Sequence, residues 1–217
     1  MRIEAIDLFC GIGGLTYGLQ QAKIKVLAGL DNDNSCEYAY KKNNKVKFIC
    51  EDVAGYDFKS MKKMYSKDSI KILAGCAPCQ TFSSHTFKLK NREKDIRWNM
   101  IEHFLRGIKI IEPDIISMEN VRGITKTQVF SDFVKQVEKM RYKVSYEVVN
   151  CADYGIPQNR NRLVFLASKL GNISVPQKTY TKDNHVSINK IIKSLPALKS
   201  GETCKKDKVQ KLETFLH

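Results

Sequence analysis

Strand-like and helix-like segments alternate along the first 168 residues, and this alternation restricts the fold more than any other feature of the sequence. Short apolar runs are separated by segments with helical spacing or by glycine turns. We predict strands at 3–9, 25–30, 47–50, 70–74, 115–118, 143–149 and 163–167. We predict helices at 14–22, 35–42, 95–111 and 130–140. This order predicts an α/β fold with a doubly wound, mostly parallel sheet.

A glycine-rich turn, Asp7-Leu8-Phe9-Cys10-Gly11-Ile12-Gly13-Gly14, joins the first strand to the first helix. Glycines let the backbone approach a ligand closely, and amides at a helix N-terminus bind anions. Thr16 stands where a dinucleotide-binding turn has its third glycine, so a pyrophosphate fits poorly. The carboxylate of an amino acid would fit the same amides.

Two aspartates follow the next two strands. Asp31 ends the second strand and could bind ribose hydroxyls, and Asp52 follows the third and could accept from an adenine amino group. Together with the glycine turn, these carboxylates suit S-adenosylmethionine. The alternative is a structural glycine turn with two surface aspartates.

A cysteine and a glutamate follow two later strands. Residues 75–84, Gly-Cys-Ala-Pro-Cys-Gln-Thr-Phe-Ser-Ser, put Cys79 in a loop after one strand, and the strand at 114–118 ends in Glu119-Asn120-Val121. If these strands are neighbours in a parallel sheet, the thiol and the carboxylate converge on one pocket. A thiolate can attack a ring carbon, and a carboxyl group can stabilise the charge that the attack creates.

The chain is strongly basic. Its 37 Lys and Arg outnumber 23 Asp and Glu, which gives a net charge of +14 and favours a polyanionic partner, most simply nucleic acid. The segment 82–97 includes His85, Lys88, Lys90, Arg92 and Lys94 and could close on a phosphate backbone. The alternative is a lysine-rich composition in which these side chains are simply solvated.

The seven cysteines are scattered and odd in number, without the spacing of a disulfide framework. No signal peptide or apolar stretch of about 20 residues is visible, so we expect a cytoplasmic protein with reduced thiols. We expect Cys76 to be a small buried residue. We expect the same small-apolar packing for Cys10, Cys36, Cys50, Cys151 and, as a larger group, Trp98.

Six motifs occur in one order: residues 7–14, Asp31-Asn32-Asp33, Asp52-Val53, Ala77-Pro78-Cys79-Gln80, Glu119-Asn120-Val121 and Gln158-Asn159-Arg160-Asn161-Arg162. In this order and spacing the chain resembles the cytosine-C5 DNA methyltransferase family from residue 3 to about 168. The resemblance implies the Rossmann-like fold of S-adenosylmethionine-dependent methyltransferases. It also implies methyl transfer to C5 of a cytosine flipped out of double-stranded DNA, with S-adenosylhomocysteine as product, in a restriction–modification setting.

The resemblance assigns roles to individual residues. Cys79 would be the nucleophile that attacks cytosine C6, Glu119 would contact N3, Arg162 would contact O2, and Arg160 would support the same pocket. The cofactor-binding residues would be Asp7, Phe9, Gly11, Ile12, Gly13, Gly14, Asp31, Asn32, Asp52, Val53 and Pro78. Asn32 departs from the family pattern, which has a large side chain stacked on adenine at this position.

Other interpretations remain open. Cys76-Ala-Pro-Cys79 is formally a C-x-x-C, as in thioredoxin-like oxidoreductases or half of a zinc site. Zinc needs four ligands and no second such pair is present, so we predict no metal site. One branch of the resembled family methylates cytosine in transfer RNA, and its catalytic residues would look similar.

The sequence changes in character after residue 168. We predict a catalytic and cofactor-binding domain at 1–168, followed at 169–217 by a basic linker or the start of an incomplete target-recognition region. The second part holds ten lysines, no arginine and four acidic residues, and 187–202 resemble the lead-in to that region. The remainder could be a second polypeptide, or the chain could be a truncated, inactive cofactor-binding fragment.

Overall fold

The computed structural model describes residues 2–78, 100–200 and 202. The predictions for Cys79, for Trp98 and for the basic segment 82–97 therefore lie outside the described residues, as does the first part of the helix expected at 95–111.

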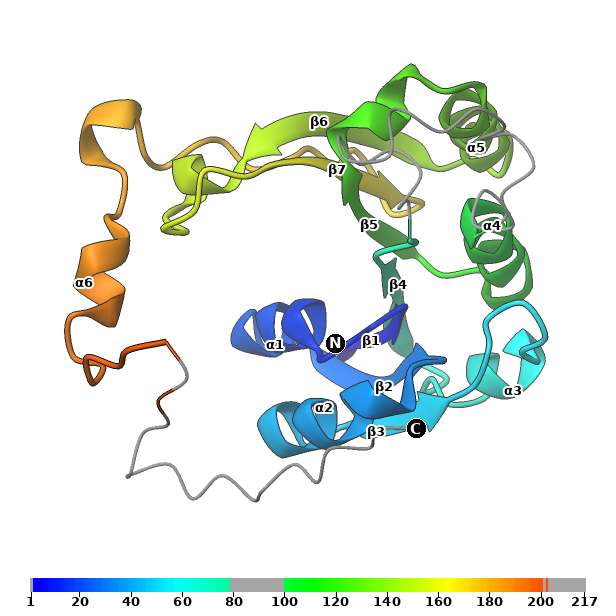
Figure 1. The fold of residues 1–217 in the computed structure, drawn as a ribbon. Helices are drawn as coiled ribbons and strands as arrows, with labels where there is room; N and C mark the ends of the chain where they lie inside the picture. The colour runs from blue at the N-terminus through cyan, green and yellow to red at the C-terminus, as the bar shows by residue number, and fades with distance from the viewer. Residues whose placement is uncertain (1, 79–99, 201, 203–217) are drawn as a thin grey trace, which may run out of the picture.

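Seven strands form one sheet in the order β3-β2-β1-β4-β5-β7-β6 (Figure 1). The strands are β1 (Arg2–Leu8), β2 (Lys25–Asp31), β3 (Lys47–Cys50), β4 (Ser69–Gly75), β5 (Ile115–Val121), β6 (Lys143–Asn150) and β7 (Asn161–Ser168). β7 is antiparallel to both of its neighbours, and the other pairs are parallel. The prediction of a mostly parallel, doubly wound sheet is confirmed.

The helices cover both faces of this sheet (Figure 1). They are α1 (Gly14–Gln21), α2 (Glu37–Asn44), α3 (Phe58–Lys62), α4 (Met100–Ile111) and α5 (Gln128–Lys139), whereas α6 (Ile188–Ile192) lies away from the sheet. α1 and α2 lie on one face, and α3, α4 and α5 lie on the other. The larger apolar core lies under the second group, where Phe104, Phe133 and Phe165 pack together. Because both faces are covered, the central strands read as continuous apolar runs.

The strand order reverses between β1 and β4. From β1 the chain winds outward through β2 and β3, and then returns to β4 on the other side of β1. In open α/β sheets the crevice for ligands lies at the carboxyl ends of the strands at such a reversal. The glycine turn after β1 and residues 76–78 after β4 both lie there.

Two local predictions need correction, and one helix was not predicted. β5 continues beyond the expected end at residue 118 to Val121, so Glu119 and Asn120 lie within the strand; the antiparallel ladder with β7 extends it. α3 was not predicted, because five residues are too few to show a helical period. Cys50 is exposed at the end of β3 and does not pack as a buried apolar group.

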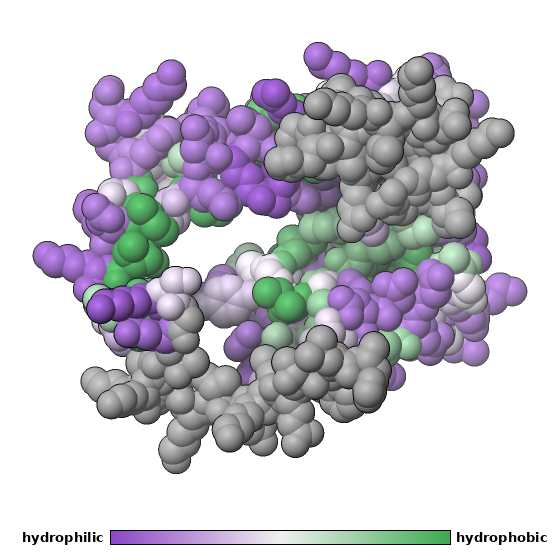
Figure 2. All heavy atoms as spheres, viewed as in Figure 1, coloured by the Kyte–Doolittle hydropathy of each residue, from purple (hydrophilic) through white to green (hydrophobic). Residues whose placement is uncertain are grey.

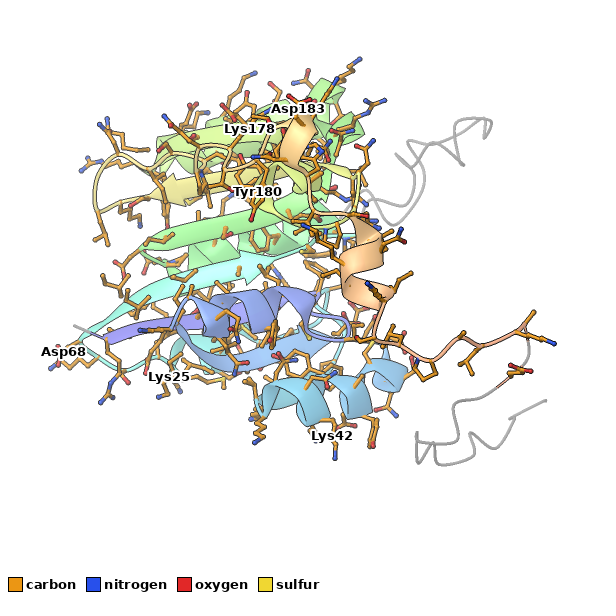
Figure 3. All side chains as sticks on the ribbon, turned by 90° about the vertical axis from the view of Figure 1, so that its left-hand side faces the viewer. Lys25, Lys42, Asp68, Lys178, Tyr180 and Asp183 are labelled. Atoms are coloured by element: carbon orange, nitrogen blue, oxygen red, sulfur yellow. The ribbon has the colours of Figure 1, made fainter. Side chains whose placement is uncertain are left out.

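The segment after β7 returns to the β6–β7 end of the sheet and then leaves it. The Asp153 carboxylate accepts from Lys178 Nζ at 2.7 Å and contacts His185 Nε2 at 3.0 Å. Lys178, Tyr180 and Asp183 lie over this end of the sheet in Figure 3. Farther along, large apolar side chains are exposed in and after α6: Ile188, Ile191, Ile192, Leu195 and Leu198. Within the described residues, no helix has the length and apolar character needed to span a bilayer.

Candidate active site

The glycine turn after β1 reverses the chain within a few residues. Phe9, Gly11 and Gly13 have positive φ angles of 58°, 49° and 91°. Such angles are strained for a side chain and easy for glycine, which explains two of the three positions. The Gly13 amide donates to Cys10 O at 2.8 Å, and the Gly11 amide donates to Asp31 Oδ2 at 2.8 Å.

The two sides of this turn differ in how much space surrounds them. At Gly11 and Gly14 an added Cβ atom would meet nothing within 4 Å, whereas at Gly13 it would overlap with Tyr40 and Asn44. The first bond of α1 runs from the Tyr17 amide to Gly13 O at 2.9 Å, so the amides of the first helical residues are not used within the helix. The outer side of the turn is therefore open and lined by backbone, as a ligand carboxylate requires.

Asp31 holds the neighbouring strand end in place. Its Oδ2 accepts from Gly11 and its Oδ1 accepts from the Asp33 amide at 3.0 Å. The Glu51 amide, just beyond β3, donates to Asp31 O at 3.2 Å. The carboxylate thus fixes the glycine turn relative to β2 and remains partly exposed at the predicted ribose position.

The other residues predicted at the adenine end lie in different surroundings. Asn32 and Asp52 are exposed, and Asp52 Oδ1 accepts from the Ala54 amide at 2.9 Å. Val53 is buried in the core, and its carbonyl oxygen accepts from Arg106 Nη2 at 2.6 Å. The cofactor contacts of these residues remain predictions.

Asp7 lies beneath the turn and is fully buried. Its Oδ2 accepts from Thr16 Oγ1 at 2.7 Å, and its Oδ1 has no hydrogen-bond partner among the described residues. Asp7 thus holds the Thr16 side chain in the first turn of α1, whose N-cap residue, Gly13, makes no side-chain cap. Burial raises the pKa of Asp7 to about 7, against the effect of the hydrogen bond from Thr16. No pattern in the sequence connects Thr16 with Asp7.

Glu119 projects from β5 and pairs with Arg162 of β7. Arg162 Nε lies 2.8 Å from Glu119 Oε1, and the two side chains are 20% and 37% exposed. The two strands bring them together, because Val121 pairs with Arg162 in the ladder. Burial raises the pKa of Glu119, although Arg162 and Arg160 act to lower it. This carboxyl group therefore takes up a proton more readily than an ordinary glutamate.

Cys76 lies beside Glu119 and was assigned only a packing role from the sequence. Gly75 of β4 pairs with Met118 of β5, so the next residue of each strand is also adjacent. Burial and the nearby charge of Glu119 raise the pKa of the Cys76 thiol. Cys76 is partly buried and stays neutral near pH 7.

Asn120 fixes the chain at the end of β4. Its Nδ2 donates to Ala77 O at 3.1 Å, and its Oδ1 accepts from the Val121 amide at 2.8 Å. The side chain is buried, so both bonds are sheltered from water. Asn120 therefore positions residues 76–78, including the partly buried Pro78, immediately before Cys79.

The predicted residues thus form two groups at one edge of the sheet. Glu119 and Arg162 meet directly, and the exposed Arg160 acts on Glu119 through its charge. The glycine turn and Asp31 form the second group, at the ends of β1 and β2. Figure 2 shows the molecule hollowed between the part built on β6 and β7 and the part that carries α1 and α2.

Comparisons with known proteins show the family of this chain. The family described as C-5 cytosine-specific DNA methylase matches residues 3–216. The Type II methylase M.HgiDII of Herpetosiphon aurantiacus is 46% identical over 90% of this chain and 55% of its own length. The Type II methyltransferase M.DdeI of Desulfomicrobium norvegicum is 30% identical over 92% of this chain and 50% of its own length. The chain therefore spans about half the length of these relatives.

Solved structures of methyltransferases have a similar fold. A putative DNA modification methyltransferase encoded within a prophage of E. coli superposes with a TM-score of 0.72 at 25% identity, over 90% of this chain and 56% of that one. The Dnmt2 methyltransferase of S. pombe shares the fold, with a TM-score of 0.65 at 20% identity over 81% of this chain and 52% of that one. With its sheet, its glycine turn and its paired Glu119 and Arg162, the chain belongs to the C-5 cytosine-specific DNA methylase family.

Proposed function

We propose that this chain carries the cofactor site and the catalytic residues of an enzyme that methylates C5 of cytosine in DNA, as part of a restriction–modification system. The observation that carries the proposal is the pairing of Glu119 with Arg162 at the strand ends where the glycine turn also lies. The names of the relatives, Type II methylases, support the substrate class and the setting.

The glycine turn would hold S-adenosylmethionine. Its open outer side at Gly11 and Gly14 leaves room for a ligand, and the first amides of α1 suit the carboxylate of the methionine part. Asp31 would accept from the ribose hydroxyls. The bound cofactor would supply an electrophilic methyl group on a sulfonium.

The protein's own side chains would make the cytosine ring reactive. The Cys79 thiolate would form a bond to C6, and the electron pair displaced from the C5–C6 double bond would make C5 nucleophilic. Glu119, whose pKa is raised by burial, would donate a proton to N3 and so neutralise the charge that develops there. After methylation a base would remove the C5 proton, and elimination of the thiolate, with return of the N3 proton to Glu119, would restore the aromatic ring.

Arg162 would both bind the cytosine and stabilise a thiolate in this site. Its Nε is held by Glu119 and its Nη1 donates to Asn161 O at 2.8 Å, so the guanidinium is fixed in position at the edge of the pocket. A fixed cation can donate to the cytosine O2 and can favour the thiolate form of a nearby cysteine.

We also propose that methylation needs a region that reads the DNA sequence and lies outside residues 1–217, on the same or on a second polypeptide. Two observations support this: the chain spans about half of its relatives, and the apolar side chains of α6 are exposed at the rim of the hollow in Figure 2.

Trapping of the covalent adduct tests the proposal. The full chain is incubated with S-adenosylmethionine and duplex DNA in which 5-fluorocytosine replaces cytosine, with and without the C-terminal half of a full-length relative. Because fluorine cannot leave as a proton does, the adduct persists and appears on a denaturing gel. We expect the adduct only when the C-terminal half is present.

The control is Cys79→Ser, which should bind S-adenosylhomocysteine like the wild type and form no adduct. Absence of the wild-type adduct in both reactions would contradict the assignment. An adduct formed by the isolated chain would instead show that the added half is unnecessary, and an adduct with RNA but not DNA would move the enzyme to the transfer-RNA branch.

A further inference from the structure

Tyr40 of α2 lies at the centre of a buried polar cluster behind the glycine turn. Its hydroxyl lies 3.0 Å from Thr16 Oγ1, which donates to Asp7 Oδ2 at 2.7 Å. Since the single Thr16 hydroxyl hydrogen points to Asp7, the Tyr40 hydroxyl donates to Thr16. The resulting chain of hydrogen bonds connects α2, α1 and β1, and all three side chains are fully buried.

The Tyr40 ring is also wedged between β2 and the turn. An added Cβ at Gly29 of β2 would overlap with the Tyr40 hydroxyl and lie 2.7 Å from Cys10 Sγ, and at Gly13 it would overlap with the ring. Cys10 packs with Tyr40 and Phe48 in a separate apolar cluster. The ring therefore packs directly against the inner side of the turn, at Gly13.

Tyr40 is itself held in position. Asn44 Nδ2 donates to Tyr40 O at 3.1 Å, and Gln20 Nε2 of α1 donates to Asn44 O at 2.9 Å. The ring lies 5.4 Å from the Phe48 ring, centroid to centroid. These contacts tie α2 to α1 behind the turn, so a change in the position of Tyr40 would be passed to the backbone of Gly13.

We propose that Tyr40 and Thr16 are positioning residues that set the shape of the glycine turn and thereby the affinity for the cofactor, which neither of them touches. The inner side of the turn rests on Tyr40, while its outer side, at Gly11 and Gly14, is open. Asp7 holds the Thr16 hydroxyl, and through it the Tyr40 hydroxyl, at the end of β1. The inference rests on the proposed cofactor site and adds the residues that hold it in shape.

The test is calorimetric binding of S-adenosylhomocysteine to the full chain, far below the unfolding temperature. Tyr40→Phe removes one oxygen and should weaken binding about five- to tenfold, the effect of one lost buried hydrogen bond. Tyr38→Phe is the matched control, because Tyr38 lies on the same helix and is 71% exposed. It should bind like the wild type.

A second pair of variants covers the case in which Tyr40→Phe does not fold. Thr16→Val removes the hydroxyl at nearly constant volume and should weaken binding. Thr16→Ser keeps the hydroxyl and should bind like the wild type. Unfolding in urea is measured for every variant, because a residue that only stabilises the fold would change that free energy alone.

The outcomes separate the inference from the function on which it rests. Wild-type protein that binds no S-adenosylhomocysteine overturns both. Wild-type binding that is matched by Tyr40→Phe and by Thr16→Val, with or without a loss of stability, overturns the positioning role and leaves the proposed function intact.

Discussion

Asp7 and Glu119 are acidic side chains at the carboxyl ends of β1 and β5, and burial raises the pKa of both. They differ in their neighbours. Asp7 is fully buried against the hydroxyl of Thr16, so it holds the Thr16 side chain in place. Glu119 is partly exposed and faces Arg162, so it remains available to a substrate. Two similar residues thus lie in different surroundings, which suit Asp7 to a structural role and Glu119 to the proposed chemical role.

The pKa of Asp7 makes the stability of the protein depend on pH. Its pKa is about 7 in the folded state, against a usual value of 3.8. Between these values the folded state binds more protons than the unfolded state, so the contribution of Asp7 to the free energy of unfolding falls as pH rises. The slope is at most about 1.4 kcal/mol per pH unit, and it vanishes above about pH 7.

Urea denaturation of wild type and Asp7→Asn at pH 5 and pH 8 measures this effect. Asparagine does not titrate, so the wild type should lose more stability than the variant between the two values. An equal change in both proteins would show that Asp7 does not carry a raised pKa.

At the scale of elements, strands and long helices were predictable because their apolar patterns are local. β1, α1 and β3 begin within one residue of the positions expected. The extension of β5 to Val121 was not predictable, because it depends on pairing with β7, about forty residues later. The links of Asp7 to Thr16 and of Thr16 to Tyr40 were missed for a related reason: a hydrogen bond between distant residues leaves no periodic signal.

Asn120 shows how two elements are joined at the site. Asn120→Ala would leave the Ala77 carbonyl and the Val121 amide without their partner and should destabilise the protein by about 1–3 kcal/mol. Asn43→Ala, at an exposed position of α2, should change stability by less than about 0.5 kcal/mol. Urea denaturation measures both. Equal effects of the two substitutions would contradict the role given to Asn120.

At the scale of the whole molecule, one edge of the sheet gathers the described residues to which the proposed chemistry assigns a role. The strand order turns around between β1 and β4, which places the glycine turn and Glu119 at the same edge, with β4 between their strands. The division at residue 168 remains a prediction. The segment after it is tied to the sheet through Asp153 and then presents the apolar side chains of α6 to solvent.

The outer side of the glycine turn is the proposed binding site for S-adenosylmethionine. Gly14 and Gly18 lie on the same helix, and an added Cβ at either would meet nothing within 4 Å. Alanine at Gly18, in the interior of α1, should raise helix stability by about 0.5–1 kcal/mol, with a smaller effect at Gly14 in the first turn. Only alanine at Gly14 would occupy the space that the cofactor needs.

Calorimetric titration of S-adenosylhomocysteine into wild type, Gly14→Ala and Gly18→Ala is therefore the most direct test. We predict that Gly14→Ala weakens binding on the order of tenfold, as overpacking of a close contact does, while Gly18→Ala binds like the wild type. Equal affinity of all three proteins, or no binding by any of them, would contradict a cofactor site at this turn.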